Sequence, residues 1–137
     1  MQPQRFVVTA VLAAVLLFAL GGTVYGWALA DFFAANMGSA IGITKEPGAF
    51  WAIGVGELAG GTLLTLVIAG WARAGSVAEG AKVGAVMALL MTISFDFVLF
   101  GTTNVANLTA VCADVVVNTV RYAIVGGFVG WMTGRER

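Results

Sequence analysis

Five polar or ionisable side chains interrupt the long apolar segments of this sequence, and they are the residues that could do chemistry. They are Glu57, Asp96, Asp114, Asn118 and Arg121. A charged side chain at the centre of a lipid-facing helix costs about 2.5–3.5 kcal/mol, so these groups are expected to point inward. Carboxylates gathered inside a membrane protein bind protons or hard cations. The set therefore predicts an intramembrane ion or solute site.

The segment TAVCADVVVNTVRYAIVGG carries three of these residues at helical spacing. Asp114, Asn118 and Arg121 follow one another at intervals of four and three residues, which places them on one helix face. Arg121 is too far from Asp114 for an ordinary pair within one helix, so it is expected to lean toward Asn118 and an acid of another helix. Glu57 is the predicted partner. Alternatively, the same residues form a structural clamp that fixes helix register.

A second, shallower group of polar residues is predicted at the outer mouth of this site. It consists of Asp31, Asn104 and Asn107. For Asp31 the alternative is that it only marks a helix end at the membrane interface. The sequence has no His, and its single Cys, Cys112, is expected to be a packing residue. Since no catalytic motif is present, we expect neither an enzyme nor a cofactor nor a metal site.

Composition places the elements that carry these residues in a lipid bilayer. The chain has 137 residues, of which 60% are hydrophobic and only 10% charged. A spanning helix needs about 20 apolar residues, and four such runs occur. The runs are residues 6–30, 49–71, 81–100 and 105–132. The prediction is an all-α polytopic membrane protein, residues 1–137 forming one four-helix transmembrane bundle with a short interfacial element between its first two helices.

Charges predict how the bundle is oriented. Seven basic and seven acidic residues cancel, so no nucleic-acid partner is expected. Lys45 lies on one side of the predicted bundle, and five basic residues lie on the other: Arg5, Arg73, Lys82, Arg135 and Arg137. The positive-inside rule then places both termini in the cytoplasm. The first run is longer than a signal-peptide core, so we expect a retained helix in an inner (plasma) membrane.

Glycines repeat at four-residue spacing in every run and predict close helix packing. They are Gly22, Gly26, Gly56, Gly60, Gly80, Gly84, Gly126, Gly130 and Gly134. Small residues at this spacing let helix backbones approach closely in a membrane. Some of these stripes are equally compatible with contacts between chains, in a homo-oligomer or a larger membrane complex.

Three stretches carry a resemblance to known proteins: GGTVYGWALADFF, GAKVGAVMALLM and LFGTTNVANLTAVCADVVVNTVRYAIVGGFVGWM. In layout the chain resembles a widespread family of small bacterial four-helix membrane proteins classed as a domain of unknown function. The resemblance implies a fold and a membrane location, and no activity. That family has aromatic or apolar residues through its fourth helix, so Asp114 and Arg121 set this chain apart.

Together these patterns predict a small oligomeric carrier or channel for a proton, cation or small polar solute. The alternative is a non-catalytic accessory or assembly subunit, docked through its glycine stripes onto a larger membrane complex.

Overall fold

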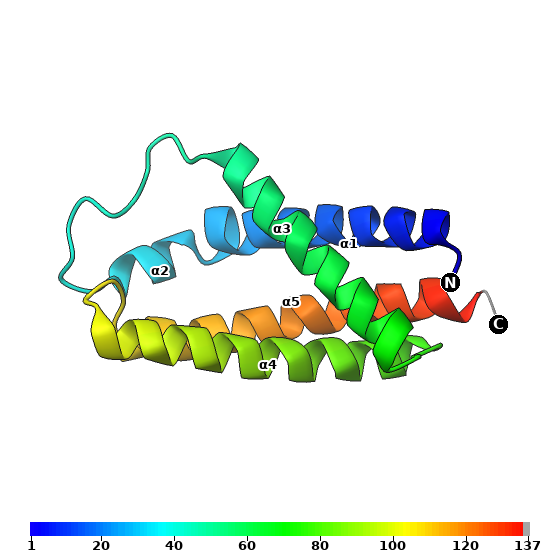
Figure 1. Ribbon diagram of the computed structural model, residues 1–137. Helices are drawn as coiled ribbons and strands as arrows, with labels where there is room; N and C mark the ends of the chain where they lie inside the picture. The colour runs from blue at the N-terminus through cyan, green and yellow to red at the C-terminus, as the bar shows by residue number, and fades with distance from the viewer. Residues whose placement is uncertain (136–137) are drawn as a thin grey trace.

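The computed structural model describes residues 1–135 and shows four long helices in one bundle (Figure 1). In chain order the elements are α1 (Pro3–Thr23), a π-helical turn (Val24–Ala28), α2 (Ala30–Ala35), α3 (Phe50–Thr65), a second π-helical turn (Leu66–Trp71), α4 (Val77–Thr102) and α5 (Leu108–Gly134). The predicted all-α four-helix fold is confirmed, and α2 is the short element expected between the first two long helices. Arg137 lies outside the described residues.

Four helical segments are long and apolar enough to cross a membrane. They are α1 and α3, each with the π-helical turn that follows it, and α4 and α5. Large apolar side chains cover the outside of the bundle; Phe95 and Val98 of α4, for example, are 70% and 64% exposed. Exposing such a large apolar surface to water is unfavourable, whereas lipid chains solvate it. The chain is therefore a multi-pass membrane protein. Which membrane holds it, and which way its termini face, stay predictions.

A capping box determines where α4 begins. The hydroxyl of Ser76 accepts a hydrogen bond from the Glu79 backbone N–H at 3.2 Å, and the Glu79 carboxylate accepts one from the Gly75 N–H at 2.8 Å. These bonds satisfy backbone donors that a helix N-terminus leaves unpaired. As a result α4 begins at Val77, one turn before the predicted start at residue 81.

Helices α4 and α5 form an antiparallel hairpin in which glycines let the two backbones touch (Figure 1). A Cβ atom on Gly80 would lie 2.1 Å from the Gly126 carbonyl oxygen, and one on Gly84 would lie 2.1 Å from the Tyr122 carbonyl oxygen. Neither distance leaves room for a side chain. The predicted packing role is confirmed here, and equally for Gly130 and Gly134, whose hypothetical Cβ atoms meet backbone oxygens of the facing segment.

Helix α3 crosses α1 diagonally, and the N-terminal half of α3 stands away from the other helices (Figure 1). At the crossing, a Cβ on Gly61 would lie 2.6 Å from the Ala14 nitrogen. Gly60 faces the Tyr122 hydroxyl, which would lie 2.7 Å from its Cβ. Both glycines thus serve packing within the chain.

Three of the predicted packing glycines make no such contact. A Cβ on Gly22, Gly26 or Gly56 would meet nothing within 4 Å. These three glycines therefore make no close backbone contact within the chain, and the contacts between chains that the sequence left open for some stripes stay a prediction.

The apolar core lies in the half of the bundle nearer the termini. Its fully buried side chains are Leu17 of α1, Leu64 and Ile68 of α3 and its extension, and Val125 and Val129 of α5. We call the end of the bundle that holds the N-terminus and residues 72–76 the termini end. The opposite end, which holds residues 29–49 and 103–107, is the loop end. The predicted site residues lie on the loop-end side of this core.

Candidate functional site

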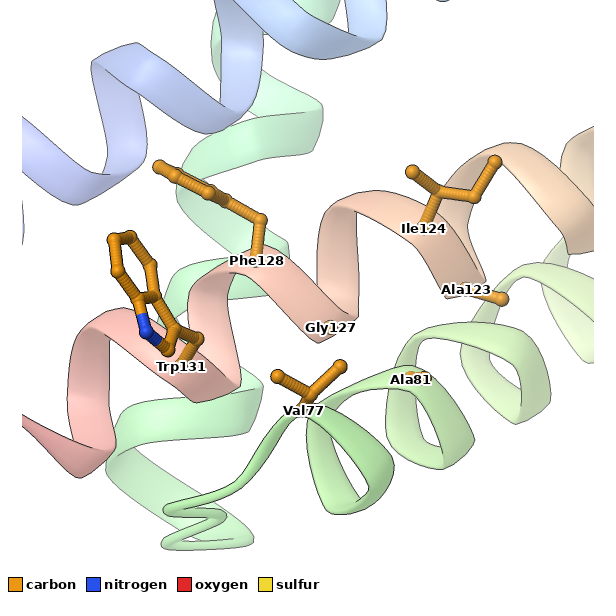
Figure 2. Close-up of a pocket in the computed structure, with 7 residues that line it drawn as sticks. All are labelled: Val77, Ala81, Ala123, Ile124, Gly127, Phe128 and Trp131. Carbon is orange, nitrogen blue, oxygen red and sulfur yellow. The ribbon is translucent and has the colours of Figure 1, made fainter.

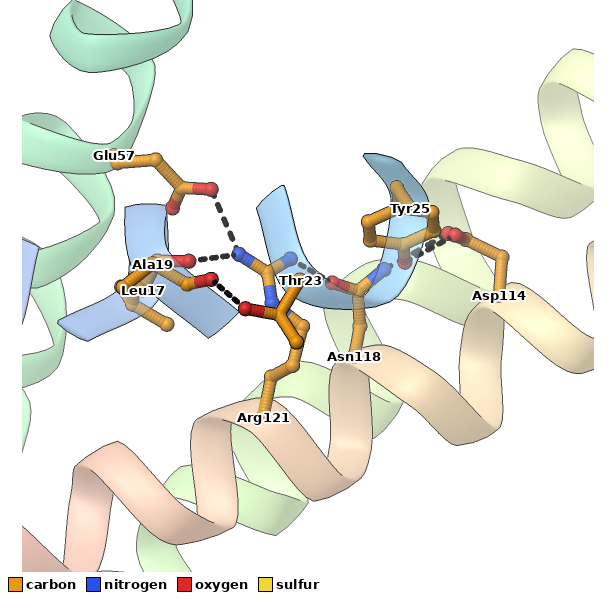
Figure 3. Close-up of polar contacts among 8 residues, drawn as sticks. All are labelled: Leu17, Ala19, Thr23, Tyr25, Glu57, Asp114, Asn118 and Arg121. Atoms are coloured by element: carbon orange, nitrogen blue, oxygen red, sulfur yellow. Dashed lines mark hydrogen bonds and ion pairs between the residues drawn. The ribbon is translucent and has the colours of Figure 1, made fainter. Parts of the chain in front are cut away.

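Arg121 is the centre of a polar network that joins three helices (Figure 3). Its side chain comes from α5 and is almost fully buried. Nη2 donates to Glu57 Oε1 of α3 at 2.7 Å and to the Leu17 carbonyl of α1 at 2.7 Å, while Nη1 donates to Asn118 Oδ1 at 2.8 Å. The ion pair with Glu57, predicted from the depth of the two residues, is present.

A glycine on α1 makes the space that the guanidinium occupies. A Cβ on Gly21 would lie 2.7 Å from Arg121 Nη2 and 3.2 Å from its Cζ. Any larger residue would push the guanidinium away from Glu57. Sequence reasoning missed this residue because Gly21 stands outside the four-residue repeat, beside Gly22.

Asp114 is held by two donors, one of which the sequence did not point out. Asn118 Nδ2 donates to Asp114 Oδ2 at 2.8 Å, and the hydroxyl of Tyr25 donates to Asp114 Oδ1 in a short hydrogen bond. The Tyr25 ring also lies over the guanidinium, 5.6 Å from Arg121 Cζ to the ring centroid. The presence of Tyr25 in an apolar run could have indicated this contact, since a buried tyrosine hydroxyl needs a hydrogen-bond partner.

The local backbone helps to place this tyrosine. Tyr25 lies in the π-helical turn that extends α1, where the helix widens before α2 begins. Such turns are rare and recur at functional sites. The turn completes an unbroken series of contacts from Glu57 through Arg121, Asn118 and Asp114 to Tyr25 (Figure 3).

A cavity of about 190 Å³ adjoins this network toward the loop end. Asp96 of α4 and Asp114 of α5 both line it. Each lies six residues from the loop end of its helix, which is about 9 Å at 1.5 Å per residue, so the two carboxylates sit at similar depth. The remaining lining is mostly apolar: Phe33, Leu99, Phe100, Thr103, Ala106, Ala110 and Val111. No basic residue is among these lining residues.

The two carboxylates of the cavity differ in their hydrogen-bond partners. Both oxygens of Asp114 accept hydrogen bonds. Oδ2 of Asp96 is buried and accepts no hydrogen bond from an N–H or hydroxyl donor in the described structure, but the Asp96 carboxyl lies within hydrogen-bonding range of the Asp114 carboxyl. Two carboxylates this close repel each other, so a proton shared between them or a bound cation is expected at this place.

The connection between α4 and α5 is tied to the segment that follows α2. The Gly38 N–H donates to the Val105 carbonyl and the Ala40 N–H to the Asn104 carbonyl, each at 3.0 Å. A Cβ on Gly38 would lie 2.1 Å from the Asn104 carbonyl oxygen, so a glycine is needed for this close approach. We call residues 36–40 the strap; together with the α4–α5 connection it closes the loop end next to the cavity.

Asn104 and Asn107, predicted at the outer mouth of the site, take part in this closure. Asn107 Oδ1 accepts from the Ala110 N–H at 2.9 Å and caps α5, while its Nδ2 donates to Asn36 Oδ1 at 3.1 Å. Neither Asn104 nor Asn107 lines the cavity, and Asp31 is exposed in the first turn of α2. That these three form the outer mouth of the site stays a prediction.

A larger groove between α4 and α5, of about 650 Å³, lies nearer the termini end (Figure 2). Its lining includes Val77 and Ala81 of α4 and Ile124, Phe128 and Trp131 of α5. No charged side chain lines this groove, so it offers apolar contact of the kind a lipid chain makes and no chemistry.

Fold and site together define a class: a small four-helix, multi-pass membrane protein with a buried ion pair and two further carboxylates on one cavity. Comparison with known protein families, with curated proteins and with solved structures finds no match to this chain. The resemblance to small bacterial membrane proteins of unknown function therefore stays a prediction, and function has to be argued from the site itself.

Proposed function

We propose that the protein is a carrier or channel that moves a proton, a small cation or a small polar solute across the membrane. The observation that carries this proposal is the close pair of carboxyls, Asp96 and Asp114, which line one cavity and include a buried Asp96 Oδ2 that no N–H or hydroxyl donor of the described structure reaches. A site of two carboxylates without a basic residue in its lining attracts positive charge.

The charge balance of the network supports a cationic cargo. Three carboxylates, those of Glu57, Asp96 and Asp114, face a single guanidinium. The guanidinium is bound directly to Glu57, whereas Asp114 is held by neutral donors. The negative charge that remains uncompensated is therefore concentrated at the cavity, where a bound cation or proton would neutralise it.

The position of the ion pair favours a carrier over an open pore. From the cavity toward the termini end, the network leads to the pair of Arg121 with Glu57, and beyond it to the fully buried Leu17, Leu64 and Val125. A solute that crosses the membrane through the bundle has to separate this pair and part this core. Such steps are conformational changes, so alternating access fits the structure better than continuous conduction.

Flux into lipid vesicles that contain the purified protein tests the proposal. A pH-sensitive dye inside the vesicles reports proton entry, and a panel of alkali cations is tested for competition. Replacing Asp96 by Asn, which keeps the size of the side chain and removes its charge, is expected to lower flux at least about tenfold. The matched control is Asp31→Asn, which changes an exposed acid outside the cavity and should leave flux unchanged.

Two results would overturn the carrier proposal. In one, vesicles with the wild-type protein are no more permeable to protons and cations than empty vesicles. In the other, Asp96→Asn conducts as the wild type does while the variant retains its helical content and detergent stability.

A specific observation favours the alternative, an accessory subunit of a larger membrane complex. Gly22, Gly26 and Gly56 face open space in the chain, so the face that they form is available for another helix. We propose that this face contacts either a second copy of the chain or a different membrane protein. Native mass measurement in mild detergent separates the two: a closed homo-oligomer supports the carrier, and a defined heteromeric complex supports the accessory role.

A further inference from the structure

We propose that the cavity between α2, α4 and α5 binds a small protonated amine with a short apolar chain. This inference rests on the proposed function in one respect only, that the cavity beside Asp96 and Asp114 is the binding site. It goes further by naming the class of ligand that the walls of the cavity select.

The lining has two chemically different parts. Asp96 and Asp114 provide the negative charge, whereas most other lining residues are apolar, with the aromatic rings of Phe33 and Phe100 among them. An alkylammonium ion has the same two parts, a charged nitrogen and a hydrocarbon chain. Carboxylates pair with the charge, and aromatic rings attract cations through their faces while they pack against hydrocarbon.

A bare metal ion fits these walls poorly. Ca²⁺ takes six to eight oxygen ligands, and Mg²⁺ takes six in a strict octahedron. The lining side chains provide two carboxylates and the Thr103 hydroxyl, which already donates to the Leu99 carbonyl. Within residues 1–135 no three His, Cys, Asp or Glu side chains converge on a point that could hold a metal.

The close carboxyls of Asp96 and Asp114 favour a ligand that brings hydrogen-bond donors between them, and this selects among organic cations. A primary ammonium carries three N–H donors, enough for Asp96 Oδ2 and a further carboxylate oxygen, while a quaternary ammonium carries none. Drug-sized ligands occupy pockets of about 300–1,000 Å³. A cavity of about 190 Å³ is smaller, so it limits the ligand to a short chain.

Binding to the purified full-length protein in detergent tests the ligand class. The probe is butylammonium, measured by calorimetry and by the shift in thermal unfolding. Sodium ion tests for a bare cation, tetramethylammonium for a cation without N–H donors, and 1-butanol for the same chain without charge. Butylammonium is expected to bind at least about tenfold more tightly than each of these, because one charge-assisted hydrogen bond is worth that factor.

Two variants and one matched control locate the bound probe. Asp96→Asn is expected to weaken butylammonium binding at least about tenfold through loss of the ion pair. Phe100→Ala should weaken it through loss of the aromatic wall. Phe95→Ala removes the same ring from the same helix, where it is 70% exposed and does not line the cavity, and should bind as the wild type does.

The outcomes separate this inference from the proposed function. If Asp96-dependent proton flux occurs while butylammonium neither binds nor competes, the amine proposal is wrong and the carrier proposal stands. If butylammonium binds and requires Asp96 and Phe100 but no cation crosses the vesicle membrane, the ligand class is supported and the carrier proposal fails. Equal binding of sodium ion or 1-butanol, or equal weakening by Phe95→Ala and Phe100→Ala, would overturn the amine proposal.

Discussion

Replacing Arg121 by Met should destabilise the bundle strongly, and the loss should be largely reversed by a second substitution. The Glu57 side chain is 17% exposed, and in the described structure Arg121 is its only charged donor. Without the guanidinium, Glu57 stays as an unpaired carboxylate among apolar helices, at a cost of about 2.5–3.5 kcal/mol on the insertion scale. Asn118 Oδ1 also loses its donor. We therefore expect Arg121→Met to lose about 3 kcal/mol, roughly a hundredfold in the folded-to-unfolded ratio.

The double substitution tests whether charge compensation is the cause. Glu57→Leu combined with Arg121→Met removes both charges and replaces them with apolar side chains, so we expect stability within about 1 kcal/mol of the wild type. With Glu57→Leu alone as the second single variant, the coupling energy between the two sites is then at least about 2 kcal/mol, because that variant leaves the Arg121 guanidinium without its carboxylate. Arg135→Met is the matched control, since Arg135 stacks on Trp131 at the termini end and its removal should cost less than about 1 kcal/mol.

Reversible unfolding in mixed micelles, followed by circular dichroism as the denaturing detergent fraction rises, measures the wild type, both single variants, the double variant and the Arg135→Met control. The reasoning is refuted if Arg121→Met unfolds at the wild-type midpoint. It is also refuted if the double variant loses as much as the two single variants together, because the loss would then come from packing rather than from an uncompensated charge.

Three other predictions follow from the contacts. Gly84→Ala places a Cβ 2.1 Å from a backbone oxygen of α5 and should lower stability by about 1–3 kcal/mol, whereas Gly22→Ala meets nothing within 4 Å and should be neutral or slightly stabilising in the same unfolding assay. Tyr25→Phe removes a donor to Asp114 and should reduce flux in vesicles without loss of helical content by circular dichroism; unchanged flux would show that this hydrogen bond is structural. In a cysteine-free background, Lys45→Cys should react with a membrane-impermeant maleimide added to intact cells and Ala72→Cys should not; the reverse pattern would show that the termini face outward.

Sequence reasoning found the helices and the central ion pair because both depend on strong local constraints. Four apolar runs of sufficient length permit few architectures, and a buried arginine requires an acid at similar depth. Glu57 was the acid that met this condition for Arg121, and the structure joins them. The glycines of α4 and α5 follow the same logic, because a repeat on both helices of a hairpin permits close packing.

The parts that were missed depend on backbone geometry and on crossing angles, which spacing alone does not determine. Tyr25 reaches Asp114 from a π-helical turn, and no residue pattern in the sequence indicated that α1 would widen there. The divergence of α3 from α1 leaves Gly22 open although its spacing resembles that of Gly80. Asn107 was expected at the outer mouth, and in the structure it caps α5 and binds the strap, because a helix start needs a capping acceptor.

The structure also moves the emphasis within the site from Asp114 to Asp96. The sequence drew attention to Asp114 because it shares a helix face with Asn118 and Arg121. In the folded chain Asn118 and Tyr25 hold it in place: each donates to one of its oxygens, and only Asn118 connects it by hydrogen bonds to Arg121 and the ion pair. Asp96 is at similar depth on the facing helix, within hydrogen-bonding range of Asp114, and no N–H or hydroxyl donor of the described structure reaches its buried Oδ2.

The two carboxylates are therefore expected to have different roles: Asp96 receives the cation, and Asp114 connects it to the ion pair. A cation that arrives at Asp96 is also close to Asp114, since both line one small cavity, and it competes with the Tyr25 hydroxyl and the Asn118 amide for the same carboxylate. If that competition loosens Asn118, Arg121 loses one of its three acceptors and its hold on Glu57 weakens. Binding at the loop end would then destabilise the pair that closes the path toward the termini end, which is the coupling that a carrier requires. The same coupling predicts that Asn118→Leu keeps the affinity for butylammonium within about threefold of the wild type yet abolishes flux; variants that lose both together would show that Asn118 only shapes the cavity.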